Sequence, residues 1–169
     1  MFYLSLLFAR MAYIALHTTG LSAGTSIIGK FVLKLDPNFL KECNKYIDTK
    51  INVTGTNGKT TTAGLITHLI KGSNKSVINN AMGANMLTGV VNALSVSLNP
   101  FKKTDFSVIE SDEAYLSKIY DKFDADYLLV TNLFRDQLDR YGELETTKRF
   151  IQDGINKKPN IKLVLNADD

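Results

Sequence analysis

Apolar and polar residues change their spacing several times along the chain, and each change predicts a helix or a strand. Short apolar runs typical of strands, followed by polar residues or glycine, occupy residues 51–54, 75–78, 105–110, 127–131 and 161–165. Between them, apolar residues recur every three or four positions, as on one helical face, at residues 59–70, 87–98, 113–123 and 143–157. This alternation predicts an α/β fold with a mostly parallel sheet and helices on both faces.

The first residues of the chain form an almost continuous apolar stretch. Residues 1–16 are interrupted only by Arg10 among charged residues, and the apolar run is too short to span a bilayer. We expect a helix packed on the domain or on a partner, with a helix lying on a membrane surface as the alternative.

A loop and a short helix are expected next. Residues 17–30 contain three glycines among small residues, which predicts a loop. Asp36 followed by Pro37 is typical of a helix start, for a short helix reaching about residue 46. We therefore divide the chain into an N-terminal helical and loop segment, residues 1–48, packing on the core, and a main domain, residues 49–169.

Composition excludes several classes of protein. The 169 residues suffice for one domain with a full core, at 44% hydrophobic and 22% charged. The net charge of +3 is too small to indicate a nucleic-acid partner. The single cysteine, Cys43, excludes an internal disulfide or a cysteine-based zinc site in this chain and indicates a reducing, cytoplasmic setting.

The stretch KINVTGTNGKTTT, residues 50–62, predicts a strand, a glycine-flanked loop and a helix start that together bind phosphate. Glycine lets the backbone approach an anion, and the free amides and dipole of the helix start attract it. Lys59 supplies a full positive charge, and Thr60 supplies a hydroxyl for Mg²⁺. The predicted nucleotide-binding residues are Gly55, Thr56, Asn57, Gly58, Lys59, Thr60 and Thr61.

This stretch departs from the strict P-loop pattern. Val53 stands where that pattern has its first glycine, so Gly55 and Gly58 form a shortened version. The alternative is an ordinary strand-to-helix turn. The apolar run before the loop and the amphipathic helix after it favour nucleotide binding.

Other polar residues follow predicted strands and would lie at the same edge of the sheet. Glu110 ends a strand and is a candidate ligand of Mg²⁺, whereas Asp112 and Glu113 are candidate caps of the next helix. The charged loop 132–143 is either a solvated loop or a site for substrate or a second metal. Its candidate residues are Arg135, Asp136, Gln137 and Arg140.

These motifs together resemble the Mur ligase family. GTNGKTTT at 55–62, Glu110, DQLDRYG at 136–142 and NADD at 166–169 resemble the central ATP-binding domain of that family. GTSIIGK at 24–30, KLDPNFL at 34–40, GANM at 83–86, SDEA at 111–114 and NLFRDQLDRYGE at 132–143 resemble its MurT branch, the ligase-like subunit of lipid II isoglutaminyl synthase.

The resemblance implies formation of an amide bond through an acyl phosphate. ATP with Mg²⁺ would phosphorylate the α-carboxyl of D-isoglutamate in lipid II, and ammonia from a GatD-like glutamine amidotransferase subunit would displace the phosphate. Lys59 and Glu110 would be the catalytic residues, Asn166 would lie near the adenine or ribose, and Asn85 would join the 132–143 residues at the substrate or second metal. A cytoplasmic protein, with membrane contact through its lipid-linked substrate, would fit this chemistry.

Two departures from the family affect these expectations. Gln137 stands where many Mur ligases have a histidine, and the position expected for a carbamylated lysine falls near Gln152, so we expect no carbamylated lysine. MurT-like proteins also continue into a zinc ribbon and a C-terminal domain. We therefore expect this chain to be part of a longer protein, to bind ATP weakly or not at all and to be inactive alone. We expect zinc only in that ribbon.

Two alternatives stay open. One is an amino-acid-adding ligase of the Mur or folylpolyglutamate synthase type, and the other is a nucleotide-binding module that is catalytically incomplete.

Overall fold

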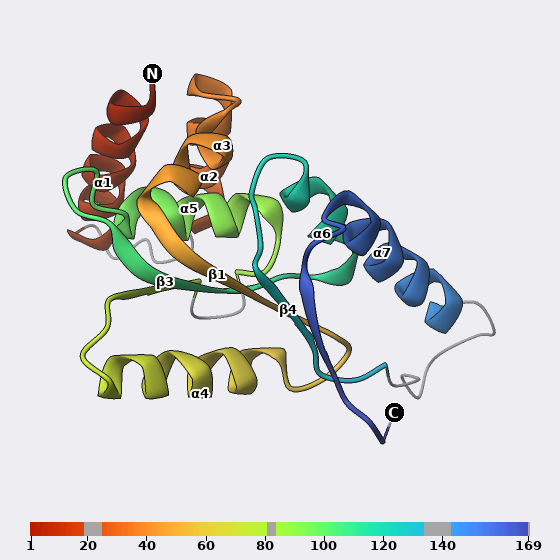
Figure 1. Ribbon diagram of the computed structural model, residues 1–169. Coiled ribbons are helices and arrows are strands. Elements are labelled where there is room, and N and C mark those ends of the chain that lie inside the picture. The colour runs from red at the N-terminus through yellow and green to blue at the C-terminus, as the bar shows by residue number, and fades with distance from the viewer. Residues whose placement is uncertain (19–24, 81–83, 134–142, 169) are drawn as a thin grey trace.

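A five-stranded parallel sheet lies at the centre of the fold (Figure 1). The computed structural model describes residues 1–18, 25–80, 84–133 and 143–168. The sheet has the order β2-β3-β1-β4-β5. Its strands are β1 Ile47–Thr54, β2 Val77–Asn79, β3 Thr104–Glu110, β4 Tyr127–Val130 and β5 Lys162–Leu165. The predicted parallel sheet is confirmed.

Strand β1 is the point at which the order of the sheet reverses. β3 and β2 lie on one side of it, and β4 and β5 lie on the other. Val53, near the end of β1, is paired with Glu110 of β3 and with Leu129 of β4. In open α/β sheets a ligand-binding crevice forms at such a reversal, beyond the carboxyl ends of the strands.

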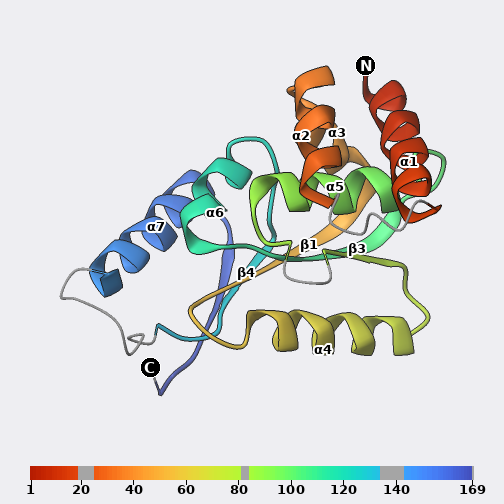
Figure 2. The same ribbon diagram turned by 180° about the vertical axis from the view of Figure 1, so that it is seen from behind.

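Helices cover both faces of the sheet, as predicted (Figures 1 and 2). Helix α4 lies on one face, over a small buried cluster of Val53, Ala63 and Val108. The other helices lie on the opposite face, where Ile109 and Leu128 belong to the larger core. Val108 and Ile109 point to opposite faces because side chains alternate along a strand. The helices are α1 Phe2–Thr18, α2 Thr25–Leu35, α3 Phe39–Cys43, α4 Lys59–Gly72, α5 Leu87–Ser97, α6 Glu113–Tyr120 and α7 Glu143–Lys157, with a 3-10 turn, η2, at Asn44–Tyr46.

The prediction of a loop over residues 17–30 is wrong at residues 17–18, which end helix α1, and from Thr25 onward, where helix α2 begins. Ile28 and Val32 are buried at helical spacing, and their packing decides the conformation of this segment. Gly29 permits this packing of α2 on α5, because a Cβ at this position would lie 1.8 Å from the backbone oxygen of Thr88 in α5. A glycine that indicates a loop in sequence is here a point of close contact between two helices.

Helix α1 packs through one side only. Phe2, Leu6 and Ala9 are buried in the larger core, and the ring of Phe2 stacks on that of Phe39 with centroids 5.3 Å apart. The Arg10 guanidinium donates a hydrogen bond of 2.6 Å to the Leu98 carbonyl at the end of α5. No helix in the described ranges is both long enough and apolar enough to cross a membrane.

The predicted apolar face of helix α4 is partly wrong. Ala63 is buried, but Leu65 and Leu69 are 59% and 61% exposed. The helix presents Ala63 and Thr67 to the sheet, and the predicted Ile66 and Ile70 pack against the same small buried cluster. Thr67 can be buried because its hydroxyl donates to the Ala63 carbonyl at 2.7 Å, within the same helix.

Candidate functional site

The loop between β1 and α4 has the backbone shape that phosphate binding requires. Gly55 and Gly58 have φ values of +122° and +80°, which residues other than glycine rarely adopt. A Cβ at Gly55 would lie 2.4 Å from the Thr131 hydroxyl oxygen and 2.8 Å from the Asn132 carbonyl oxygen. Gly58 precedes the first turn of α4, which contains Thr60 and Thr61 with exposed side chains. The amides at this helix start therefore face an accessible surface.

The end of strand β4 braces this loop from the side. The Asn57 N–H donates to the Asn132 side-chain oxygen at 3.0 Å, and the Asn132 amide donates to the Asn57 carbonyl at 3.2 Å. The Thr131 hydroxyl donates to the same carbonyl at 2.7 Å, and the Thr56 N–H donates to the Asn132 carbonyl at 2.9 Å. These bonds fix the loop in shape, so its glycines hold a preformed conformation rather than a flexible one.

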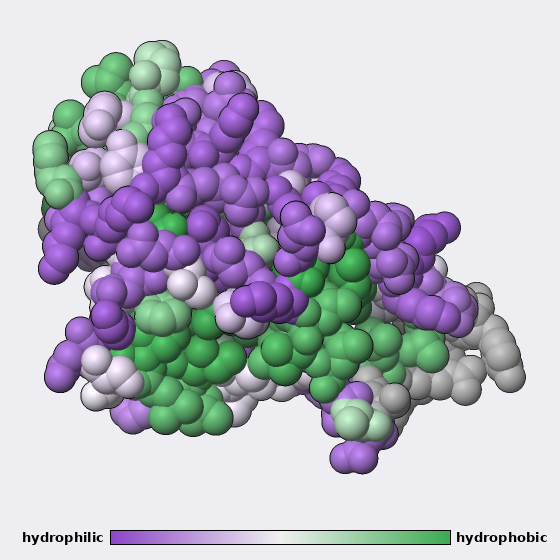
Figure 3. Space-filling view, viewed as in Figure 1, coloured by the Kyte–Doolittle hydropathy of each residue, from purple (hydrophilic) through white to green (hydrophobic). Residues whose placement is uncertain are grey.

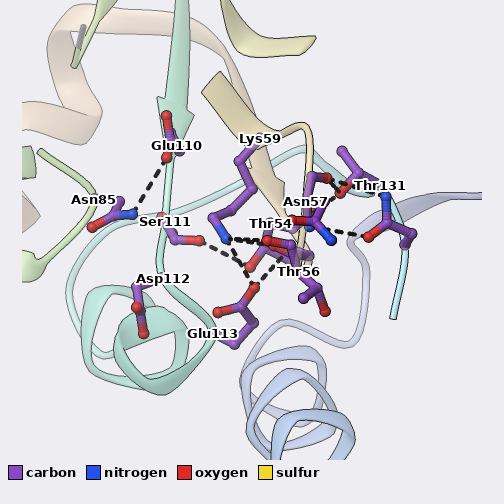
Figure 4. Close-up of polar contacts among 12 residues, drawn as sticks. Thr54, Thr56, Asn57, Lys59, Asn85, Glu110, Ser111, Asp112, Glu113 and Thr131 are labelled. Atoms are coloured by element: carbon purple, nitrogen blue, oxygen red, sulfur yellow. Dashed lines mark hydrogen bonds and ion pairs between the residues drawn. The ribbon is translucent and has the colours of Figure 1, made fainter. Parts of the chain in front are cut away.

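The Lys59 ammonium folds back over the loop (Figure 4). It donates to the carbonyl oxygens of Gly55 and Thr56 at 2.5 and 3.2 Å, and it pairs with Glu113 at 3.3 Å. The same Glu113 oxygen accepts the Gly55 N–H at 3.1 Å. A negatively charged group thus lies against the ammonium and a loop amide, which are the donors expected to bind phosphate.

Glu113 is a site residue that sequence reasoning missed. The sequence indicates Glu113 only as a candidate helix cap. Asp112 fills that role, because its side chain accepts the Ala114 N–H at 2.9 Å. Glu113 lies in the first turn of α6, so its side chain points back past the strand end toward the loop. The one available signal was its position just after the strand carrying Glu110.

Glu110 lies in a second polar group, beside the loop. It is 3% exposed at the end of β3, and its carboxylate accepts a hydrogen bond of 3.3 Å from the Asn85 amide. Asn80 holds the Glu110 backbone on both sides, donating to its carbonyl at 2.7 Å and accepting its N–H at 2.8 Å. The structure thus brings together Asn85 and Glu110, two candidates from distant parts of the sequence (Figure 4).

A buried chain of hydrogen bonds supports both groups from beneath. The Thr54 hydroxyl donates to the Ser111 carbonyl, and the Ser111 hydroxyl donates to Asn52, each at 2.9 Å. Asn52 in turn donates to the Tyr120 hydroxyl oxygen at 3.2 Å. Burial raises the pKa of Tyr120 well above its ordinary value, so the phenol stays neutral. These hydrogen bonds connect β1 to the segment that holds Glu110 and Glu113, a link that sequence spacing does not reveal.

Asn166 shares a depression with the loop. The depression has a volume of about 370 Å³ and is lined by Asn57, Gly58 and Thr62 on one side and by Leu129, Val164 and Asn166 at the ends of β4 and β5. Apolar side chains in a depression beside such a loop suit the binding of a nucleoside. The candidates Arg135, Asp136, Gln137 and Arg140 lie outside the described residues.

These groups fit a nucleotide with Mg²⁺. The loop amides and Lys59 would hold phosphate oxygens, while Thr60, Glu110 and Asn85 offer oxygen atoms suited to Mg²⁺. Within the described ranges there is no group of three or more acidic, histidine or cysteine side chains that could hold a metal. Mg²⁺ commonly binds through one or two carboxylates together with substrate phosphates, so a site with few protein ligands suits it.

Comparison with known proteins agrees with this architecture. The family model described as the Mur ligase middle domain matches residues 53–169. The MurT subunit of glutamine-hydrolysing lipid II isoglutaminyl synthase from Staphylococcus aureus (strain COL) is 38% identical over 161 residues, 95% of this chain and 36% of the relative. The corresponding subunit from Streptococcus pneumoniae (strain ATCC BAA-255 / R6) is 37% identical over 165 residues, 98% of this chain and 36% of the relative.

The chain therefore spans about a third of the length of these curated relatives. Among solved structures, the MurF ligase from Thermotoga maritima in complex with ADP is similar, with a TM-score of 0.67 at 22% identity, covering 82% of this chain and 33% of that one. At this identity the likeness shows a shared fold.

Proposed function

The chain belongs to the Mur ligase family, and from that premise we propose that it forms the ATP-binding part of an ATP-dependent carbon–nitrogen ligase of peptidoglycan synthesis. The proposed reaction activates the α-carboxyl of D-isoglutamate in lipid II as an acyl phosphate. Ammonia then displaces the phosphate to give the amide. The 37–38% identity to MurT subunits over nearly the whole chain supports this choice of substrate.

The observation that carries the proposal is the position of Lys59. Its side chain is 15% exposed, and the ammonium lies over a loop with two glycines at positive φ and beside a carboxylate. In the proposed role this carboxylate gives way to phosphate oxygens, and Lys59 then offsets the negative charge that gathers on the transferred phosphoryl group. Phosphorylation supplies the leaving group that a free carboxylate lacks.

Glu110, Asn85 and Thr60 would hold Mg²⁺ beside the phosphates. The buried position of Glu110 and its bond to Asn85 favour this role, because a ligand fixed by neighbours keeps its geometry when the ion binds. The ion, when bound, lowers the negative charge of the phosphate oxygens. Asn166 would contact the adenine or ribose from the depression next to the loop.

Ammonia would come from a glutamine amidotransferase subunit of the GatD type. The relatives' description as subunits of a glutamine-hydrolysing synthase supports a partner of this kind. A cytoplasmic setting, at the inner face of the membrane where a lipid-linked substrate would lie, completes the proposal.

An amidation assay tests it. The full-length protein is combined with an amidotransferase subunit, lipid II, glutamine, ATP and Mg²⁺, and the stem peptide is followed by mass spectrometry. We expect amidation with the unchanged protein and none with Lys59→Ala, whose circular dichroism should match the unchanged protein. Full amidation by Lys59→Ala would contradict the role of this residue. Transfer of an amino acid in place of ammonia would favour the amino-acid-adding alternative.

A further inference from the structure

Helix α1 has an outward side as apolar as its buried side. Leu4, Leu7, Met11 and Ile14 are 56–63% exposed, whereas Phe2, Leu6 and Ala9 fill the core. A surface helix of a globular protein normally turns charged residues outward. Figure 3 shows the resulting apolar area over α1. An exposed surface of this kind indicates a contact with another apolar surface.

The apolar surface continues onto helix α2. The rings of Phe8 and Phe31 approach to 6.2 Å between centroids, and Phe31 is 50% exposed. We call Leu4, Leu7, Phe8, Met11, Ile14 and Phe31 the N-terminal apolar face. It extends over two helices and therefore presents a broad surface rather than a narrow groove.

The charges of these two helices have one sign. Neither α1 nor α2 contains Asp or Glu, while Arg10, Lys30 and Lys34 are basic. Lys30 and Lys34 are exposed and lie within one turn of Phe31. The nearby acid Glu42 on α3 is paired with Lys45 at 2.7 Å. The face thus combines exposed apolar side chains with two lysines for which the described part of the chain supplies no ion-pair partner.

We propose that the N-terminal apolar face docks on the surface of a bilayer that contains anionic lipids. Its apolar side chains would enter the boundary between headgroups and acyl chains, with the lysine ammonium groups at the headgroups. The helix lies on the membrane rather than across it, in agreement with its length. A protein partner is less well matched, because the outward side of α1 offers few hydrogen-bonding groups to it; the Tyr3 hydroxyl there already bonds Tyr46.

This docking does not depend on ligase activity. A lipid-linked substrate would lie at the same surface, but the apolar and basic residues are sufficient for the proposed docking. Lys59→Ala should therefore bind vesicles like the unchanged protein. Loss of ligase activity and loss of membrane docking can therefore be distinguished by experiment.

Co-sedimentation with vesicles tests the proposal. The chain is mixed with vesicles of phosphatidylcholine alone and with vesicles that also contain phosphatidylglycerol. We expect binding to the second kind, at least about tenfold weaker partitioning for Leu7→Ser with Met11→Ser, and a weaker dependence on anionic lipid for Lys30→Gln with Lys34→Gln. Leu65→Ser with Leu69→Ser, on the equally exposed side of α4, is the matched control and should bind unchanged.

Three outcomes would overturn the proposal. The first is absence of vesicle binding by the unchanged protein. The second is equal loss of binding in the α1 and α4 variants. The third is a dimer that light scattering detects and that Leu7→Ser with Met11→Ser dissociates, without any vesicle binding, which would assign the face to a second copy of the chain. Circular dichroism of each variant shows whether the fold is retained.

Discussion

Glu110 and Glu113 stand close together in sequence, yet they contact different parts of the site. Glu110 ends a strand, is almost fully buried and accepts a hydrogen bond from Asn85. Glu113 begins a helix and contacts the Lys59 ammonium and the Gly55 amide. The end of strand β3 holds the Glu110 carboxylate in a buried position. The start of helix α6 directs the Glu113 carboxylate back over the loop. Two acids of the same type are thereby suited to a metal and to the phosphate-binding donors, respectively.

The largest expected effect comes from Glu110→Gln. Loss of the charge would remove the proposed ligand of Mg²⁺, so Mg²⁺-dependent binding of an ATP analogue should weaken on the order of a hundredfold. Calorimetry with and without Mg²⁺ measures it. Binding without Mg²⁺ serves as the control and should change little. Tight binding that is indifferent to Glu110 would instead favour a nucleotide-binding module.

The change Glu113→Gln should act in the opposite direction. A carboxylate beside the loop repels polyphosphate, and one unit charge about 4 Å from another contributes about 1 kcal/mol in water-like surroundings, so the analogue should bind about fivefold more tightly. The same calorimetric titration measures this. Weakening as large as that of Glu110→Gln would mean that Glu113 is itself a ligand and would remove the distinction between the two acids.

Asp112→Ala tests the helix start that directs Glu113. Loss of the cap to the Ala114 N–H should lower the free energy of unfolding by about 1 kcal/mol, measured in urea. Nucleotide affinity should stay within about twofold, since Asp112 does not contact the loop. A large loss of affinity would show that the cap also positions Glu113.

The smallest expected effect involves Asp105, near the amino end of the strand β3 that ends in Glu110. Hydrogen bonds from the side chain and backbone of Ser76, together with Lys75, lower the pKa of Asp105 to about 2. Since the folded pKa lies below the ordinary 3.8, its stabilising effect is present above about pH 4 and is lost as pH falls toward 2. Unfolding of Asp105→Asn should depend less on pH in that window. Binding of the ATP analogue by Asp105→Asn at neutral pH should not change.

The parts of this architecture that were predicted are those governed by local pattern. Residues 50–62 combine an apolar strand, two glycines and a helix start, and each feature restricts the backbone without help from distant residues. The same holds for Asp112 as a helix cap and for helix α7, whose predicted bounds agree with the structure. The roles proposed for Lys59 and Glu110 stay predictions.

The parts that were missed depend on contacts between distant segments. The glycines of residues 17–30 predict a loop where helix α2 forms, because Gly29 is required by close contact with helix α5 and not by a turn. The exposed Leu65 and Leu69 followed a helical spacing, but the sheet beneath α4 takes Thr67 instead. The pairing of Glu113 with Lys59 requires α6 to lie beside the loop, which sequence spacing does not reveal.

The contact at Gly29 also constrains the far side of the molecule. Backbone oxygen of Thr88 lies against Gly29, and a Cβ on the adjacent Gly89 would lie 2.4 Å from the Ala84 oxygen. Backbone atoms cannot rotate away as side chains can, so these two contacts leave no room for a larger residue at Gly29 or Gly89. Asn85 follows Ala84 directly, and its amide donates to the Glu110 carboxylate, so close backbone packing extends from helix α2 to a residue next to the candidate metal ligand.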